Sequence, residues 1–264
     1  MIFFKTKLIL LLFVVTMQVN AQEYAIDQSC NHHRVLSDNV HNLATHNQAC
    51  DSSLSARLEN FKKWLVAHKE SDTEITNDIK IRKEDMTDTA LVRIDTTGVI
   101  FEGSQSAPIW IIAYVSISCP LCKKRYKGLY ESVTSGPLAG IARIGIKPFI
   151  LDQTNVALVA AGKWHKQAAL MNALEPVTNR TTMEIITHIT DSLKIPRNEF
   201  IKSCQDSSQI SYLHRSYAEG VLNEVSSTPT FFINGHRYRS YIDTQWVIDA
   251  IEYRNECDCT IQRK

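Results

Sequence analysis

The sequence has no marked excess of either charge, and this narrows the partners to consider. Its 264 residues include 29 lysines and arginines against 28 aspartates and glutamates, for a formal net charge of +1. A nucleic-acid partner is therefore not indicated, because such proteins carry a basic patch or stripe. Internal repeats and low-complexity tracts are also lacking. With 44% hydrophobic and 22% charged residues, the chain has a globular rather than a disordered composition.

After the N-terminal region, long apolar runs are lacking, and no later segment is apolar for long enough to cross a bilayer. The N-terminus itself has the layout of a secretory signal peptide. Lys5 and Lys7 accompany an apolar run over Leu8–Val15, and a small-residue exit ends at Ala21. We expect residues 1–21 to be removed and the protein to be exported, in the periplasm or elsewhere outside the cytoplasm. The alternative is an uncleaved membrane anchor, for which the apolar run is short.

The remaining pattern predicts three segments. Residues 22–88 are polar, with apolar residues at helical spacing, which predicts a small helical N-terminal extension. The order after that is strand, helix, strand, helical block, β-hairpin and helix. Strands separated by a crossover helix predict an α/β sheet that is covered on both faces. We therefore expect an α/β domain over residues 89–256, with a helical insertion at about 155–225, and a C-terminal tail over 257–264.

Local signals place several elements. Ser71 and Glu74 fit a capping box at a helix start. Ile109–Val115 is almost wholly apolar, which suits a central strand buried on both faces. Asn234-Gly235 stands between two predicted strands and is a strong hairpin signal. The other expected elements are a helix through Leu54, Leu58, Phe61 and Leu65 capped by Asp51 or Ser52, an edge strand or hairpin over Leu91–Phe101, a strand over Ile141–Leu151, and one helix over Val156–Leu174.

Two cysteines spaced one helical turn apart, Cys119 and Cys122, directly follow the predicted central strand. Thiol–disulfide exchange needs a thiolate, and a free cysteine is mostly protonated at neutral pH. Cys119 begins a predicted helix, where unpaired N–H groups and the macrodipole favour negative charge. Cys122, on the same helix face, is placed to attack a mixed disulfide formed at Cys119. The pair therefore predicts a redox-active centre.

Two other readings of this pair are half of a zinc site and a structural disulfide. A four-cysteine zinc site would need a second CxxC, which the chain lacks. Cys257-Asp258-Cys259 has the wrong spacing for it, so we expect no metal at Cys119 and Cys122. Pro120 fits the first helical position, where its missing N–H costs nothing.

A second signature lies far downstream at Thr228-Pro229, ahead of a strand predicted over Thr230–Ile233. Proline at the mouth of a strand cannot join the ladder, so it marks an edge or a special turn. A cis Thr228–Pro229 bond would be a deliberate local feature. It would expose the Thr228 backbone to pair with an extended substrate strand beside Cys119. Taken alone, such a dipeptide is more often an ordinary turn.

Together, the strand–CPLC–helix unit and the segment TPTFFINGHRY at Thr228–Tyr238 resemble the thioredoxin superfamily. Within it, the chain is most similar to the DsbA-like branch of exported thiol–disulfide oxidoreductases. The resemblance covers about residues 90–254 and includes Gly103–Pro108 before the central strand. It implies a thioredoxin-like α/β fold with a helical insertion, preceded by the small helical N-terminal extension.

The same resemblance implies roles for single residues. Cys119 matches the family's nucleophile, Cys122 its resolving cysteine and Pro229 its cis-proline, with Thr228 beside it. Pro120 and Leu121, between the cysteines, are the positions that tune the redox potential. Leu121 stands where the best-known oxidase members have histidine, so the direction of the reaction stays open.

The remaining cysteines give weaker signals. Cys30 and Cys50 are candidates for a disulfide that staples the helical extension, because small exported segments commonly need one. The alternative is a metal site with the histidines between them. Cys204 falls on a predicted helix and is expected to be a buried thiol. Cys257 and Cys259 are too close for an easy disulfide with each other. Three roles stay open for them: a disulfide with another cysteine, binding of a soft metal, or a second thiol–disulfide exchange relay.

The resemblance implies an enzyme, a protein-disulfide oxidoreductase that exchanges disulfides with extracytoplasmic thiol or disulfide proteins. It needs no cofactor, works with a membrane redox partner and is expected to act as an oxidase. One rival is a reductase or isomerase, including one that serves cytochrome maturation. Another is a non-enzymatic copper-binding or chaperone-like protein, because soft thiolates select Cu(I). The substrate proteins and the oligomeric state stay open.

Overall fold

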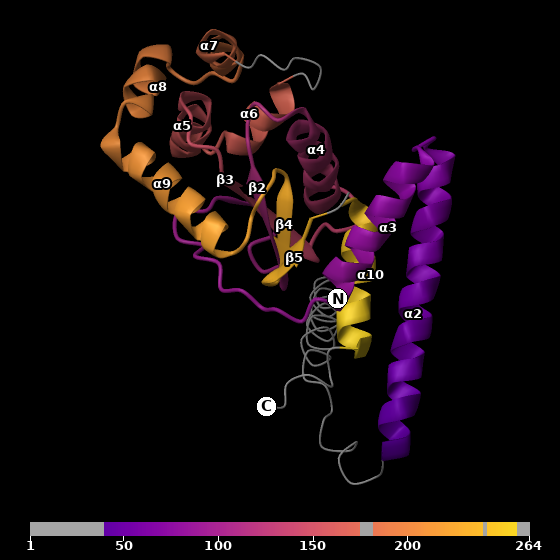
Figure 1. Cartoon of the computed structure of the whole chain (residues 1–264). Helices are drawn as coiled ribbons and strands as arrows, with labels where there is room; N and C mark the ends of the chain where they lie inside the picture. Colours follow the sequence, from indigo (N-terminus) through magenta and orange to yellow (C-terminus); the bar gives the residue numbers. More distant parts are fainter. Residues whose placement is uncertain (1–39, 175–181, 240–241, 258–264) are drawn as a thin grey trace, which may run out of the picture. The chain divides into compact units, whose positions relative to one another are not determined.

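The computed structural model describes residues 40–174, 182–239 and 242–257 (Figure 1). The expected signal peptide, Cys30 and Cys259 lie outside this part of the chain. Two compact units divide it, one with residues up to Glu59 and from Ala250 onward, the other from Asn60 to Asp249. The segment boundaries drawn from the sequence, including the one after residue 88, stay predictions.

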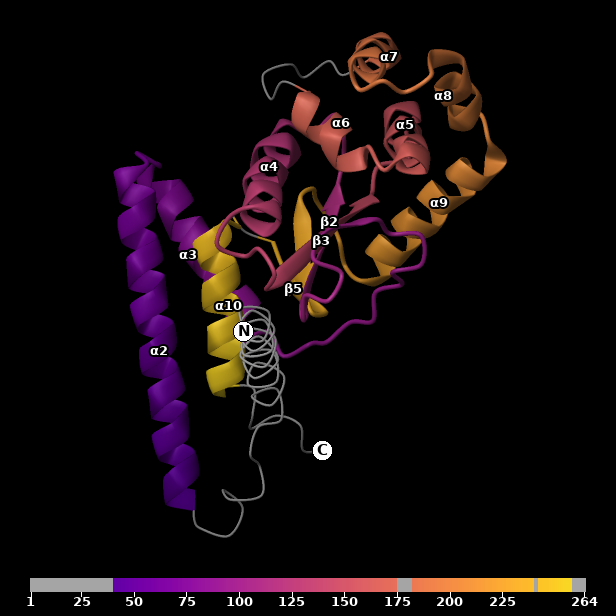
Figure 2. The same cartoon turned by 180° about the vertical axis from the view of Figure 1, so that it is seen from behind.

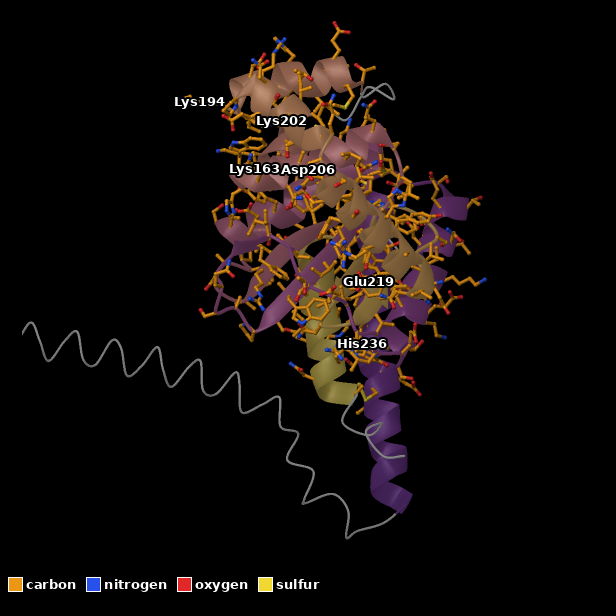
Figure 3. The ribbon with its side chains drawn as sticks, turned by 90° about the vertical axis from the view of Figure 1, so that its left-hand side faces the viewer. Lys163, Lys194, Lys202, Asp206, Glu219 and His236 are labelled. Carbon is orange, nitrogen blue, oxygen red and sulfur yellow. A yellow bond between two sulfur atoms is a disulfide. The ribbon has the colours of Figure 1, made fainter. Side chains whose placement is uncertain are left out.

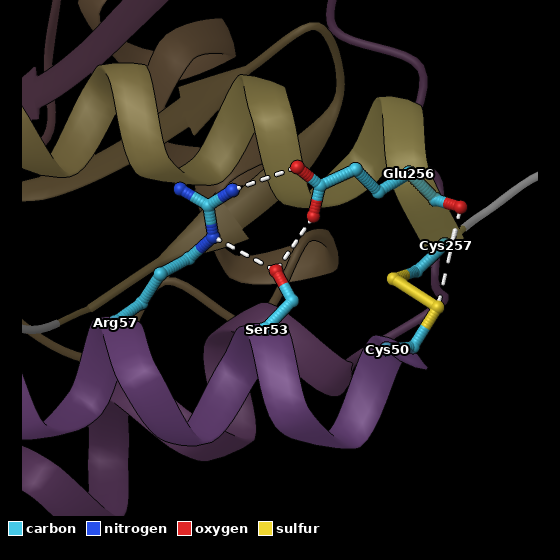
Figure 4. The surroundings of a disulfide bond; sticks show 5 residues. All are labelled: Cys50, Ser53, Arg57, Glu256 and Cys257. Atoms are coloured by element: carbon cyan, nitrogen blue, oxygen red, sulfur yellow. Dashed lines mark hydrogen bonds and ion pairs between the residues drawn. A yellow bond between two sulfur atoms is a disulfide. The ribbon is translucent and has the colours of Figure 1, made fainter. Parts of the chain in front are cut away.

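The smaller unit consists of parts of two helices, α2 (Val40–Ala67) and α10 (Thr244–Cys257). The cap expected at Asp51 or Ser52 is wrong, because α2 already begins at Val40 and both residues lie inside it. A disulfide joins Cys50 of α2 to Cys257 at the end of α10, with 5.7 Å between their Cα atoms (Figure 4).

Polar contacts surround this disulfide within the same unit. The Ser53 hydroxyl donates to Glu256 at 2.6 Å, and the Arg57 guanidinium pairs with Glu256 at 3.0 Å (Figure 4). Arg57 also pairs with Glu252 at 2.9 Å. Exposed pairs of this kind contribute little singly. They fix which turns of α2 and α10 face each other, and so bring the two sulfur atoms into register.

The larger unit opens with the last turns of α2 and with α3 (Asp72–Thr87). The predicted capping box is confirmed. The Glu74 carboxylate accepts from the Ser71 backbone N–H at 2.9 Å, and the Ser71 hydroxyl accepts from the Glu74 N–H at 3.3 Å. These bonds satisfy N–H groups that a helix start leaves unpaired.

The described residues form a five-stranded sheet in the order β1-β3-β2-β4-β5. Its central pair is parallel, since β2 runs beside β3 with Ile109 opposite Ala142 and Val115 opposite Pro148. The other neighbours are antiparallel. The strands are β1 (Phe101–Gly103), β2 (Ile109–Val115), β3 (Ala142–Pro148), β4 (Thr230–Ile233) and β5 (His236–Tyr238). The predicted α/β sheet, its buried central strand and its Asn234-Gly235 hairpin are confirmed.

Helices cover both faces of this sheet, with α4 and α9 on opposite sides (Figures 1 and 2). The stretch between β3 and β4 is helical, as the predicted insertion requires. The helix expected over Val156–Leu174 is wrong, because His165 takes a left-handed conformation with φ of 54° and ends the turn before it. The helices are α4 (Pro120–Thr134), α5 (Gln153–Ala160), the 3₁₀ turn η1 (Ala161–Trp164), α6 (Gln167–Ala173), α7 (Met183–Ser192), α8 (Arg197–Cys204) and α9 (Ser207–Leu222).

A charged network lies inside the larger unit where α9 meets the sheet. Lys147 of β3 is only 4% exposed and pairs with Glu219 of α9, which is labelled in Figure 3. The Tyr114 hydroxyl also donates to Glu219, at 2.9 Å. Burial of the ring and the nearby Glu219 carboxylate raise the pKa of Tyr114. Since each charge has a partner, the network anchors α9 without an unpaired buried ion.

Candidate active site

The site is built where β2 ends. The parallel strands β2 and β3 end at the same edge of the sheet, and the loop Ser116–Ser118 leads from β2 to the N-cap of α4. Cys119 is that N-cap residue, with an extended backbone, and Pro120 follows in the first helical turn as predicted. A helix mouth offers N–H groups without intrahelical partners, so a sulfur placed there is held by donors.

The structure brings the two predicted redox sulfurs together and gives them different surroundings. The Cys122 backbone N–H donates to the Cys119 sulfur at 3.2 Å. The Cys119 sulfur also lies 3.5 Å from the Thr228 carbonyl oxygen, to which its protonated form donates. Cys119 is partly exposed, whereas Cys122 is fully buried, and both are free thiols. Only the first sulfur is therefore open to a partner.

The electrostatics separate the two thiols further. A hydrogen bond from the Cys122 thiol is the largest cause, and together with the backbone N–H groups of Cys122 and Leu121 it outweighs burial and lowers the pKa of Cys119 to about 6. Burial, with the neighbouring Cys119 sulfur adding to it, raises the pKa of Cys122 far above the ordinary value. At neutral pH, Cys119 is thus the thiolate of the pair and Cys122 the protonated thiol.

Thr228 and Pro229 lie beside Cys119, as the sequence predicted. The Thr228–Pro229 peptide bond is cis. Pro229 is buried and directly precedes β4, which pairs with β2 through Thr230 and Tyr114. That pairing carries the loop before β4 to the edge where Cys119 lies, because neighbouring strands hold their flanking loops together.

The residues between and after the cysteines differ in exposure. The Leu121 side chain is 52% exposed, so it lies on the surface next to the reactive sulfur. Lys123 is buried, and its pKa is lowered by that burial, an effect that the two cysteines oppose. Lys124 and Lys127 are exposed.

Sequence reasoning missed two residues of the site, Ser116 and Asn155. The Ser116 carbonyl accepts from the Cys119 N–H at 3.1 Å. Asn155 lies in α5, far from the CPLC motif in sequence, and bonds to the loop before Cys119. A lone asparagine in a helical segment carries no motif, so only Ser116, three residues before the nucleophile, could have been suspected.

The structure corrects one predicted disulfide. Cys50 is bonded to Cys257, so the expected Cys30–Cys50 pair is replaced. The helix face decides this, because α10 presents Cys257 to Cys50 within bonding reach. Cys204 is a buried free thiol as predicted, and burial raises its pKa to about 11. Across residues with described side chains, no group of three or more histidine, cysteine or acidic residues could hold a metal ion. The histidines of the alternative metal site lie outside those residues.

Comparison with known proteins agrees with this geometry. The model of the thioredoxin family matches residues 95–252. The structure of a thioredoxin-like oxidoreductase from Silicibacter pomeroyi is similar, with a TM-score of 0.52 and 13% identity, over 64% of this chain and 95% of that chain.

Two further structures have the same fold. For BdbD from Bacillus subtilis, the TM-score is 0.53 and the identity 14%, over 64% of this chain and 100% of that chain. For alpha-DsbA1 from Wolbachia pipientis, the TM-score is 0.51 and the identity 15%, over 65% of this chain and 96% of that chain. The comparison with curated proteins gave no match.

The predicted thioredoxin-like α/β fold with its helical insertion and the resemblance to DsbA-like structures are thereby confirmed. The family model spans more than half of the chain and includes the CPLC motif and Thr228-Pro229. By fold, by site geometry and by this match, the chain belongs to the thioredoxin family.

Proposed function

We propose that this protein is an exported thiol–disulfide oxidoreductase in which Cys119 is the nucleophile and Cys122 the resolving cysteine. One observation carries the proposal. A partly exposed sulfur with a pKa of about 6 lies within bonding reach of a fully buried thiol whose pKa is raised. Thiol–disulfide exchange needs that asymmetry, because one sulfur must react with the substrate and the other must stay protonated until it resolves the mixed disulfide.

The proposed oxidation proceeds in two balanced exchanges. A substrate thiolate attacks the Cys119 sulfur of the Cys119–Cys122 disulfide, and Cys122 leaves and takes up a proton. A second substrate thiolate then attacks its partner sulfur in the mixed disulfide and releases Cys119 as thiolate. The substrate loses two electrons and gains a disulfide, while the pair gains those electrons and ends as the Cys119 thiolate and the Cys122 thiol. A redox partner, which we propose lies in the membrane, reoxidises the pair.

The low pKa of Cys119 favours the oxidase direction. A stabilised Cys119 thiolate lowers the free energy of the reduced pair, and this makes its disulfide more oxidising. The signal-peptide pattern of residues 1–21 supports export, and so does the Cys50–Cys257 disulfide, which suits an oxidising compartment. Within the described part of the chain, no helix has the length and apolar character to cross a membrane.

Replacement of Cys119 with serine tests the proposal. We expect the rate of dithiol oxidation of a reduced peptide to fall by at least about a hundredfold, since a hydroxyl cannot replace the thiolate. Cys122→Ser has no internal disulfide for the reduced peptide to attack, but its Cys119 thiolate should attack an oxidised substrate peptide, release one substrate thiolate and accumulate a mixed disulfide, visible by mass. Cys204→Ser, which removes a buried thiol away from the site, serves as the control. Unchanged turnover in Cys119→Ser would refute the proposed chemistry.

A redox titration against glutathione decides between oxidase and reductase. The low pKa of Cys119 favours a potential closer to about −120 mV than to the value of about −270 mV that marks reductases. Leu121 in place of the histidine of well-known oxidases is a feature that would shift the potential toward the reductase range.

Exposed lysines beside the site predict a charge preference among substrates. Lys124 and Lys127 are exposed and have no ion-pair partner among the residues the structure describes. By helix rise they lie about 7.5 and 12 Å along the axis from Cys119, and helical side chains lean toward the N-terminus. Both distances are comparable with the screening length of about 10 Å at 0.1 M salt.

The ratio of the Cys119 rates with an anionic aromatic disulfide and with cystamine, which is cationic, should therefore contain an electrostatic factor in addition to the faster departure of an aromatic thiolate. Changing Lys124 and Lys127 together to glutamine should lower that rate ratio about threefold, and added salt should have the same effect. Lys194 and Lys202, exposed lysines of the insertion (Figure 3), provide the matched double glutamine control. A ratio that neither the variant nor salt changes would contradict the preference.

A further inference from the structure

A completely buried asparagine connects the helical insertion to the loop that carries Cys119. Asn155 lies in α5 and is 0% exposed. Its Oδ1 accepts from the Ile117 backbone N–H at 3.0 Å, and its Nδ2 donates to the Ser116 hydroxyl at 3.1 Å. A buried polar group must be paired, and Asn155 finds its partners in this loop.

Asn155 is itself held in place at the start of its helix. Asp152 is the N-cap of α5, and its Oδ1 accepts from the Asn155 backbone N–H at 2.8 Å and from Asn155 Nδ2 at 2.9 Å. The side chain amide is thus fixed from two directions. A group fixed in this way can hold a loop more firmly than a surface side chain that must be ordered first.

The loop residue that Asn155 holds contacts both redox cysteines. The Ser116 carbonyl accepts from the Cys119 N–H at 3.1 Å, and a Ser116 backbone hydrogen bond lowers the otherwise raised pKa of Cys122. The Ser116 hydroxyl also bonds to that of Ser118 at 2.9 Å. A displacement of Ser116 would therefore change the surroundings of both sulfurs at once.

We propose that Asn155 is a positioning residue for the redox pair, and that it sets the Cys119 thiolate through Ser116 and Ile117. The inference rests on the proposed function, because it concerns how well that site works. Hydrogen bonds to a sulfur weaken steeply with distance and angle, so a small shift of the loop loosens the bond from the Cys122 N–H to Cys119. The insertion is then part of the site rather than only a cover for the sheet.

Asn155→Ala tests the proposal, with the reduced full-length mature protein as the material. We expect the pKa of Cys119, measured from the pH dependence of iodoacetamide alkylation, to rise by about half a unit or more toward the ordinary value. The glutathione titration should show a less oxidising pair. Asn172→Ala is the matched control, because Asn172 is a partly buried asparagine of the insertion and its Oδ1 has no hydrogen-bond partner.

A merely structural role would give a different result. In that case Asn155→Ala would lower the melting temperature while the pKa of Cys119 and the redox potential stayed at wild-type values, and this would overturn the inference. If Asn155→Ala fails to fold, Ser116→Ala tests the inference instead. It removes the hydrogen bond between Asn155 and the Ser116 hydroxyl and should also raise the pKa of Cys119. If the wild-type protein shows no thiol–disulfide exchange, the proposed function is rejected, whatever the effect of Asn155→Ala.

Discussion

Changing Cys50 and Cys257 together to alanine should lower the free energy of unfolding by up to about 5 kcal/mol. The disulfide joins residues separated by 207 positions, so it removes a large share of the unfolded chain's conformational freedom. The chain-entropy treatment of disulfides gives the figure, and native-state effects often reduce it. Urea denaturation of the oxidised wild type and of the double variant measures the difference.

Two controls make this result interpretable. Cys204→Ala removes a buried thiol that has no disulfide, and it should cost far less than the double variant. Arg57→Gln removes two exposed ion pairs from the same helix contact and should cost at most about 1 kcal/mol. A double variant no less stable than Cys204→Ala would show that the covalent link contributes nothing to the stability of the folded chain.

The pairing of Cys50 with Cys257 marks the limit of the sequence prediction. Cys30 was the expected partner because a small exported segment commonly needs a disulfide of its own, and loop length alone cannot rank two partners when both are sterically allowed. The choice depends on which turn of α10 faces α2, and the contacts of Arg57 and Ser53 with Glu256 set this. No local pattern carries that information.

The sheet and the CPLC site were predictable because their signals are local. An apolar run of strand length, followed at once by a cysteine and a proline, fixes where β2 ends and α4 begins. The Thr228-Pro229 dipeptide before an apolar strand is equally local. Their meeting at one edge of the sheet followed from family resemblance, and the hydrogen bond from Cys119 to Thr228 bears it out.

The edge strand or hairpin expected over Leu91–Phe101 was wrong for a physical reason. The apolar residues there do bury themselves, and Ile94 belongs to the core with Tyr114. The polar residues between them form a turn instead of a ladder, since Asp95 accepts from the Thr97 N–H at 2.9 Å and Gly98 takes φ of 76°. Side chains that hydrogen-bond to the backbone thus offer it an alternative to strand pairing in this segment. As a result, β1 contains only Phe101–Gly103.

Asn155 illustrates a different limit. The insertion at about 155–225 was correctly expected to be helical, but its first helix was placed from Val156 instead of Gln153. The pattern of apolar residues gave no reason to single out one amide. Its importance depends on where the first turn of α5 lies relative to the end of β2, which is a tertiary relation. Residues that position a nucleophile from another element are therefore the part of a site least visible in sequence.

Alkylation of reduced protein at Cys119 should have an apparent pKa near 6. Below that pH, the rate should fall about tenfold per unit, and between pH 7 and 9 it should be nearly constant. For an ordinary thiol, the alkylation rate would go on rising until about pH 8.5. The hydrogen bond from the Cys122 thiol is the largest cause of the shift, so Cys122→Ala should move the midpoint upward. Timed iodoacetamide labelling followed by mass measurement gives the profile.

The same shift makes the stability of the reduced protein depend on pH with a definite sign. The folded pKa of Cys119 lies below the unfolded one, so between about pH 6 and 8.5 the unfolded chain binds more protons than the folded chain. The stabilisation is fully present above the unfolded pKa and is lost as pH falls through about 6. The oxidised protein, whose pair carries no titrating thiol, should lack this dependence, as should Cys119→Ser. Reduced and oxidised proteins with parallel stability profiles from pH 5 to 9 would mean that no thiolate is stabilised at the helix mouth.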